Sequence, residues 1–123
     1  MEIQFTDREL DIMNVLWEHG AATAGQVRER LADDLAYNTV LTMLRILEEK
    51  KFVTHEEAGR AFVYRPLVPR EAAGRSAVQR LVRKLFRGRP ELLLTQLAED
   101  RDLDAETIRR MRELLDQRLE EKQ

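Results

Sequence analysis

Hydrophobic residues in the first 32 positions recur at helical spacing in two segments, each preceded by a capping signal. The first apolar stripe consists of Leu10, Met13, Leu16 and Trp17. Thr6 and Glu9 form a capping box before it and Gly20 follows it, so a helix is predicted to begin at Thr6 and to end at Gly20. A second box, Thr23 with Gln26, predicts a second helix that runs to about residue 32.

A third helical pattern runs from about Tyr37 to Lys50 and has two distinct faces. The apolar face is made of Val40, Met43, Leu44 and Leu47. The opposite face is polar and carries Asn38, Thr42, Arg45 and Glu49. Because side chains three and four positions apart share one side of a helix, we predict a helix that buries one face and exposes the other.

After the third helix, the spacing of hydrophobic residues changes from helical to the alternating pattern of strands. Residues 52–56 and 61–65 are predicted strands, and residues 57–60 between them contain Gly59, which favours a hairpin turn. From about Pro69 the pattern is helical again, with three apolar stripes separated first by a Gly and Pro pair and then by an N-cap candidate, Asp104. These stripes comprise Ala73, Ala77, Leu81, Val82 and Leu85; Leu92, Leu93, Leu94 and Leu97; and Ile108, Met111, Leu114, Leu115 and Leu119.

The order of three helices, two strands and three further helices predicts a mainly α protein with a small β-hairpin wing. We expect a winged helix-turn-helix domain over residues 1–68 and a helical dimerisation domain over residues 69–123. The last helices have narrow apolar stripes between heavily charged faces, so they need a partner, and a second copy of the chain is the simplest one. The predicted dimer contacts are Leu81, Leu85, Leu97, Ile108, Met111 and Leu115.

Charge and composition narrow the function. The formal net charge is −2, but residues 1–66 carry −4, residues 67–98 carry +5 and residues 99–123 carry −3. The chain has no cysteine and only two histidines, His19 and His55, without metal-ligand spacing, so we expect no metal, no cofactor and no catalytic site. It contains neither an apolar run of about 20 residues nor a signal-peptide pattern, which predicts a cytoplasmic protein without membrane contact.

The polar face of the third helix suits the major groove of double-stranded DNA. Asn38 can pair with an adenine edge, Thr39 and Thr42 can meet thymine methyl groups or phosphates, and Arg45 can reach a guanine or a phosphate. Residues predicted to fix the register on phosphates are Tyr37, Arg60 and Arg65. Two alternatives stay open. The face can be an ordinary solvated surface, or the winged helix can be a protein-interaction module that uses Leu41 and Ile46 as a contact patch.

Three segments of the chain resemble the penicillinase-repressor family of the BlaI/MecI type. They are residues 10–17 in the first helix, residues 35–44 in the third helix and residues 59–66 in the hairpin. The resemblance implies a homodimeric transcriptional repressor that binds near-palindromic operators related to TACA/TGTA. It also places Thr39 and Thr42 in the major groove and Arg60 on the wing. The genes it implies are those of β-lactam resistance, with a sensor metalloprotease that cuts the repressor in its dimerisation domain.

The chain departs from this family pattern at three points. The copper-responsive branch carries C-terminal cysteines, and this chain has none. The β-lactam branch is usually cut at an Asn-Phe bond, whereas the matching position here is Gln96-Leu97. Family recognition helices often carry a basic pair and then a glycine near their end. Here Ile46 follows Arg45, and Lys51 stands at the glycine position.

Overall fold

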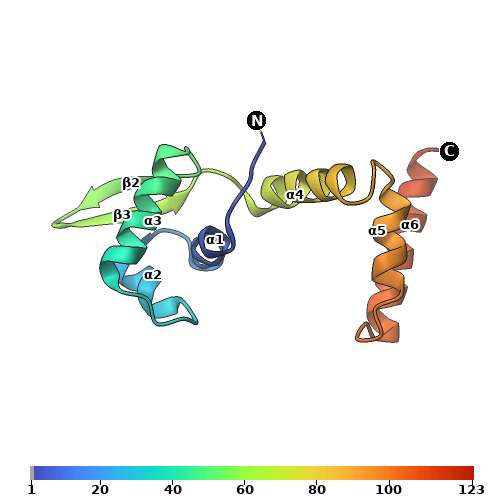
Figure 1. Ribbon diagram of the computed structural model, residues 1–123, viewed down its shortest axis with the longest axis horizontal. Helices are drawn as coiled ribbons and strands as arrows, with labels where there is room; N and C mark the ends of the chain where they lie inside the picture. The colour runs from blue at the N-terminus through green and yellow to red at the C-terminus, as the bar shows by residue number, and fades with distance from the viewer. Residues whose placement is uncertain (1) are drawn as a thin grey trace. The chain divides into compact units, whose positions relative to one another are not determined.

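The computed structural model describes residues 2–123 as nine helices and strands in two compact units, one that extends to Val78 and one from Gln79 to Gln123 (Figure 1). The elements are α1 (Asp7–His19), β1 (Ala22–Thr23), α2 (Ala24–Arg30), α3 (Tyr37–Glu49), β2 (Val53–Ala58), β3 (Ala61–Pro66), α4 (Arg70–Lys84), α5 (Pro90–Ala98) and α6 (Ala105–Glu121). This is the predicted class, mainly α with a β-hairpin wing.

Local capping explains where three helices begin, and all three predicted N-caps are confirmed. The Thr6 and Thr23 hydroxyls each accept a hydrogen bond from the backbone N–H three residues on, and both capping boxes are complete. Asp104 caps α6 by accepting from the Thr107 N–H at 2.8 Å. Each such cap satisfies backbone donors that the helix itself leaves unpaired, and is worth about 1 kcal/mol.

Glu9 has a second role besides capping, because it also links α1 to the end of α3. Its side chain is almost fully buried and accepts a 2.8 Å hydrogen bond from the Lys50 ammonium group. Burial disfavours the charged form of Glu9, but the bonds from Lys50 and Thr6 outweigh it and hold the pKa of Glu9 below its ordinary value. The Glu9 carboxylate therefore stays charged at neutral pH and pairs with the Lys50 ammonium group at the end of α3.

The sheet has three strands in the order β1-β3-β2, and one of them was not predicted. The two-residue strand β1 pairs antiparallel with β3, with Ala22 opposite Tyr64. Two residues are too few to show an alternating pattern, which is why the sequence did not reveal this strand. The hairpin is also longer than predicted. Its pairing continues to Ala58 opposite Ala61, so the predicted four-residue turn shrinks to Gly59 and Arg60.

The predicted end of the second helix at about residue 32 was wrong by two residues. The helix ends at Arg30, because Leu31 adopts an extended backbone with ψ 143°. In that conformation Leu31 turns toward the core and packs against it half-buried.

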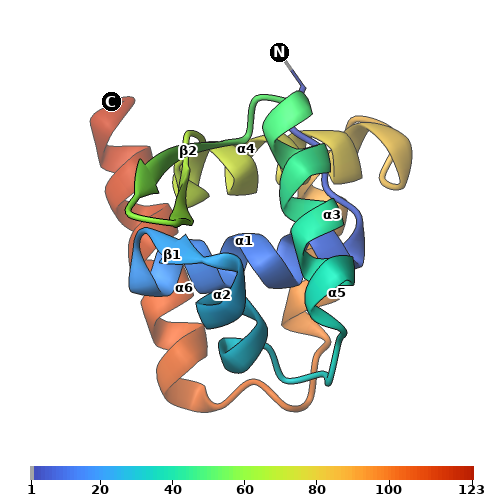
Figure 2. The ribbon, with the colours of Figure 1, turned by 90° about the vertical axis from the view of Figure 1, so that its left-hand side faces the viewer.

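The core of the N-terminal unit forms where α1, α2 and α3 meet the sheet. The predicted apolar face of α3 is confirmed, because Val40, Leu44 and Leu47 are fully buried. The other large side chains that are completely buried are Ile12, Met13, Leu16, Val27, Val53 and Tyr64. In Figure 2, α3 and the β2–β3 hairpin both lie on the side turned to the viewer, with α2 below them. The core therefore leaves the outer face of α3 and the hairpin free.

The first half of α4 packs on the winged helix. Ala73 is buried, and the indole N–H of Trp17 donates to the Val68 carbonyl at 2.8 Å. The Arg70 guanidinium lies over the Trp17 ring, 5.4 Å from its centroid. The Ser76 hydroxyl binds both backbone groups of Ile3, at 3.0 and 3.1 Å. The DNA-binding domain predicted over residues 1–68 leaves out α4, whereas the compact unit extends to Val78 and includes the first half of this helix.

These contacts predict the fragment that folds on its own. We expect residues 1–78 to unfold cooperatively, and residues 1–68 to be less stable by about 2–4 kcal/mol. The shorter fragment loses the burial of Ala73, the cation–π contact and the Ser76 hydrogen bonds. Urea denaturation followed by circular dichroism measures the difference. Equal midpoints and slopes for the two fragments would contradict this assignment of α4.

The turn after α3 contains backbone strain at the position where the sequence departs from the family glycine. Lys51 has φ 68°, in the left-handed region that favours glycine. The Lys51 N–H donates to the Glu48 carbonyl and the Phe52 N–H to the Leu47 carbonyl, both at 3.0 Å. This pair of bonds is a Schellman motif, which normally places glycine at the left-handed position.

Replacing Lys51 with glycine should therefore stabilise the protein by about 0.5–1 kcal/mol, because a Cβ atom in this conformation is disfavoured. Thermal unfolding of Lys51→Gly measures the gain. Lys51→Ala is the matched control, since it removes the side chain but keeps the Cβ atom and should not stabilise. A gain of the same size in both variants would show that the Lys51 side chain, and not its backbone conformation, causes the strain.

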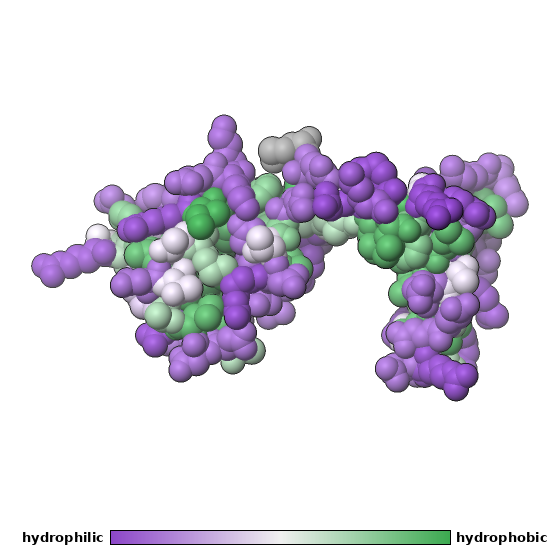
Figure 3. Space-filling view, in the orientation of Figure 1, coloured by the Kyte–Doolittle hydropathy of each residue, from purple (hydrophilic) through white to green (hydrophobic). Residues whose placement is uncertain are grey.

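The C-terminal unit has apolar side chains that its own fold does not cover. Neither α5 nor α6 contains a buried residue. Leu85 is 65% exposed, Leu114 66% and Leu119 58%. Figure 3 shows a hydrophobic patch over the junction of α4 and α5. Isolated exposed leucines are common on proteins, but an apolar stripe repeated along consecutive helices is typical of an interface.

Candidate nucleic-acid interface

The outer face of α3 is open to solvent and carries the predicted base-reading residues. Asn38, Thr39, Thr42 and Arg45 are all exposed, and so is Tyr37 at the first position of the helix. The N-cap residue is Ala36, which has no side-chain acceptor and makes no side-chain cap. The first N–H groups of α3 therefore remain available to an external acceptor, unlike those of α1, α2 and α6.

A hollow of about 200 Å³ lies between α3 and the hairpin and brings several predicted residues together. Tyr37 and Arg45 line it from α3, and Arg60 and Phe62 from the hairpin. The rest of its lining consists of Thr23, Ala24, Leu41, Ala61 and Tyr64. One arginine from α3 and one from the hairpin thus line the same hollow. The sequence had separated Arg45 and Arg60 into a base-reading and a phosphate-binding role, and only the fold brings them to one site.

The two arginines of the wing differ in their surroundings. Arg60 occupies the two-residue turn, and no carboxylate of residues 2–123 pairs with it. Arg65 lies on β3 and forms a 2.8 Å ion pair with Glu56 on β2. An arginine already paired with a carboxylate has less net charge to offer an external anion. The wing tip therefore places Arg60, more than Arg65, where it can meet a phosphate.

A polar contact between α3 and β2 was not predicted. The Nδ1 atom of His55 lies 2.6 and 2.8 Å from the two carboxylate oxygens of Glu48, and both side chains are 30% exposed. The His55 ring stacks on Phe62, with centroids 4.4 Å apart, and lies 5.4 Å from the Tyr64 ring. Burial, and then the charge of Glu48, raise the pKa of the Tyr64 hydroxyl. Seven positions separate Glu48 from His55 across a helix-to-strand turn, so no periodic pattern connects them.

Among residues 2–123, no three His, Cys, Asp or Glu side chains come together in a way that could hold a metal ion. Within the same residues, no helix combines the length and the apolar character needed to cross a membrane.

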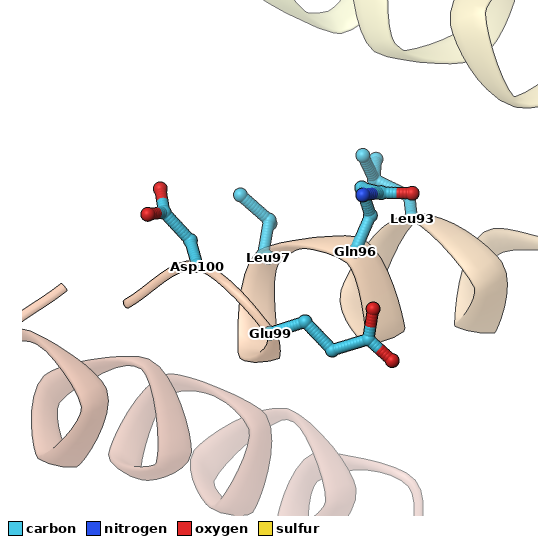
Figure 4. Close-up of a pocket in the computed structure, with 5 residues that line it drawn as sticks. All are labelled: Leu93, Gln96, Leu97, Glu99 and Asp100. Atoms are coloured by element: carbon cyan, nitrogen blue, oxygen red, sulfur yellow. The ribbon is translucent and has the colours of Figure 1, made fainter. Parts of the chain in front are cut away.

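The predicted dimer contacts all lie in the unit from Gln79 to Gln123 and are exposed or half-buried there. The predicted cleavage bond, Gln96–Leu97, lies in the last turns of α5. Both residues line a shallow hollow of about 450 Å³ with Leu93, Glu99 and Asp100. In Figure 4 the side chains of Leu93, Gln96 and Leu97 project to the same side of the helix. The bond is accessible in position but helical in conformation.

A helix-turn-helix followed by a β-hairpin, with an exposed polar helix beside an arginine-bearing wing, defines the class of winged-helix DNA-binding proteins. The family model described as penicillinase repressor matches residues 5–117. The chain belongs to the penicillinase repressor family.

Individual comparisons agree with this membership. The penicillinase repressor of Bacillus licheniformis is 25% identical over 116 residues, which cover 93% of this chain and 91% of the relative. The methicillin resistance regulatory protein MecI of Staphylococcus aureus is 22% identical over 117 residues, covering 94% and 95%. The solution structure of monomeric B. licheniformis BlaI in complex with the blaP half-operator is 31% identical with a TM-score of 0.51, covering 58% of this chain and 90% of that chain.

Proposed function

We propose that this protein is a homodimeric transcriptional repressor that binds a near-palindromic operator, with one winged helix on each half-site. The observation that carries the proposal is the exposed polar face of α3 beside a hollow flanked by Arg45 and Arg60. The similar BlaI domain was solved on a half-operator, which supports DNA as the ligand. Because α3 has the dimensions and polar side chains of a major-groove reader, it is the recognition helix of this model.

Each predicted residue has a definite role in this model. Asn38, Thr39 and Thr42 read base edges from the exposed face of α3. Arg45 reads a base or the adjacent backbone, and Tyr37 with the uncapped helix start binds a phosphate. Arg60 contacts the backbone from the wing tip. Arg65 adds to that contact only after it leaves Glu56, which makes it the weakest of the assigned residues.

Dimer formation is the second part of the proposal. No residue of α5 or α6 is fully buried within one chain, so their stripes are available to a second copy. A dimer would also double the DNA contact and match a two-fold operator. The proposed contacts are Leu81, Leu85, Leu97, Ile108, Met111 and Leu115.

The proposed targets and release mechanism follow from the family. We propose an operator related to TACA/TGTA, control of genes for β-lactam resistance, and release by a sensor metalloprotease that cuts at Gln96–Leu97. Proteases bind the cleaved segment in an extended conformation. Because this bond is helical, the end of α5 has to unwind before it can be cut.

The direct test is fluorescence anisotropy with a labelled duplex that carries a TACA/TGTA inverted repeat, compared with a scrambled duplex at two salt concentrations. Tight binding of two chains to the repeat alone supports the proposal. If both duplexes bind equally and weakly, selection from random DNA identifies a diverged operator. If selection enriches no sequence, the winged helix is a protein-interaction module and the repressor proposal fails.

Substitutions in the interface should separate base reading from phosphate binding. Thr42→Ala should weaken binding to the operator but leave binding to the scrambled duplex unchanged, so that sequence preference relaxes. Arg60→Ala should weaken binding to both duplexes and reduce the salt slope by about 1, because one phosphate contact is lost. Arg101→Ala, in the loop between α5 and α6, removes the same charge far along the chain and is the control. If Arg60→Ala and Arg101→Ala behave alike, the wing tip does not contact DNA.

The dimer interface is tested by a charge placed in the α6 stripe. Leu115→Glu should raise the monomer–dimer dissociation constant about 100-fold or more, because burying an unpaired carboxylate costs several kcal/mol. Analytical ultracentrifugation measures this change. Gln117→Glu adds the same side chain to the charged side of α6 and should leave the dimer intact. If Leu115→Glu leaves the dissociation constant unchanged, the dimer interface does not include the α6 stripe.

A further inference from the structure

The contact between Glu48 and His55 is the only polar bridge, among the residues that the structure describes, that joins α3 directly to a hairpin side chain. A carboxylate can only accept, so the Nδ1 atom of His55 must carry the hydrogen that it donates to Glu48. Neither residue lines the hollow between α3 and the wing. They lie beside it, on the two elements that carry Arg45 and Arg60 into the interface.

The hairpin is otherwise held to α3 mainly at its base. Val53 and Tyr64 are fully buried, whereas the residues toward the turn, from Glu56 to Phe62, are exposed. His55 lies where the buried base of the hairpin meets its exposed end, because it is paired with the buried Tyr64 and followed by the exposed Glu56. Its ring also stacks on Phe62, which lies two residues after Arg60. A chain of contacts thus runs from Glu48 on α3 through His55 on β2 to Phe62 on β3.

We propose that Glu48 and His55 are a positioning pair that fixes the wing relative to the recognition helix, and so sets the distance between the DNA contacts of Arg45 and Arg60. This inference rests on the proposed DNA binding. A wing held only at its base would sample several angles, and Arg60 would have to be ordered at the moment of binding, at an entropic cost. The pair removes that cost before DNA arrives without touching DNA itself.

Any test has to distinguish the effect of the Glu48 charge on DNA affinity from the effect of its hydrogen bond to His55. Loss of a carboxylate near DNA strengthens phosphate binding by itself. Glu49, the next residue on α3, is exposed on the polar face, so Glu49→Ala measures the largest gain in affinity that the loss of one carboxylate charge can give. Glu48→Gln also loses the charge but retains an oxygen that accepts from His55.

The first experiment measures operator affinity for Glu48→Ala, Glu48→Gln and Glu49→Ala by anisotropy. We expect Glu48→Ala to bind about five- to tenfold more weakly than Glu49→Ala, which is the usual net effect of losing one intramolecular hydrogen bond. We expect Glu48→Gln to recover most of this difference. Equal affinities for Glu48→Ala and Glu48→Gln would overturn the proposal, because both variants lose the charge and only the alanine variant loses the acceptor for His55.

The second experiment is a double-mutant cycle that combines His55→Phe with Arg60→Ala. It measures a coupling in operator affinity that would be absent if His55 had only a structural role. His55→Phe preserves stacking on Phe62 but cannot donate to Glu48. Arg60→Ala lowers operator affinity by some factor in the wild type and by another in the His55→Phe background. If the pair positions the wing, the factor in the His55→Phe background should be about one third of that in the wild type. The same factor in both backgrounds, with unfolding midpoints unchanged, would overturn the proposal while leaving the DNA-binding function intact. Absence of DNA binding by the wild-type protein would overturn both.

Discussion

The winged-helix unit depends on α3 burying one face completely while the opposite face stays in solvent. Val40, Leu44 and Leu47 are fully buried, and each contributes about 1.5–3 kcal/mol of burial free energy. A helix anchored by three such residues cannot rotate about its axis without exposing them. Thr42 and Arg45 therefore have one orientation, set by the core and not by their own contacts. The same core, through Tyr64, holds the base of the hairpin beside α3.

The positions of the charged groups, and not their sum, explain how an acidic half of the chain can present a surface for phosphate. Residues 1–66 carry a net charge of −4, yet several of their carboxylates are paired within the fold. Glu9 binds Lys50, Glu48 binds His55 and Glu56 binds Arg65. Arg60 is left without a carboxylate partner within residues 2–123 and flanks the hollow with Arg45. Phosphate binding responds to this local arrangement and not to the total charge.

The two units of the chain satisfy their hydrophobic residues in different ways. The N-terminal unit closes its own core and includes the first half of α4, held by Trp17 and Ser76. In the C-terminal unit, the apolar residues of α5 and α6 remain at least partly exposed. The first unit thus completes a hydrophobic core by folding, and the exposed stripes of the second unit are the surface on which the proposed dimer rests.

The sequence by itself determined every element except β1, because the signals of the others are local. Capping boxes, the 3.6-residue period of α3 and the glycine of the hairpin depend on residues within a few positions of one another, and the exposed face of α3 followed from that period. Tertiary structure alone decided what depends on distant partners. The strand β1 exists only because Tyr64 pairs with Ala22, and α4 joins the first unit through contacts with distant residues, such as Ser76 with Ile3 and Arg70 with Trp17. Arg45 and Arg60 share one hollow, and Glu48 meets His55, because the core turns α3 and the hairpin toward each other.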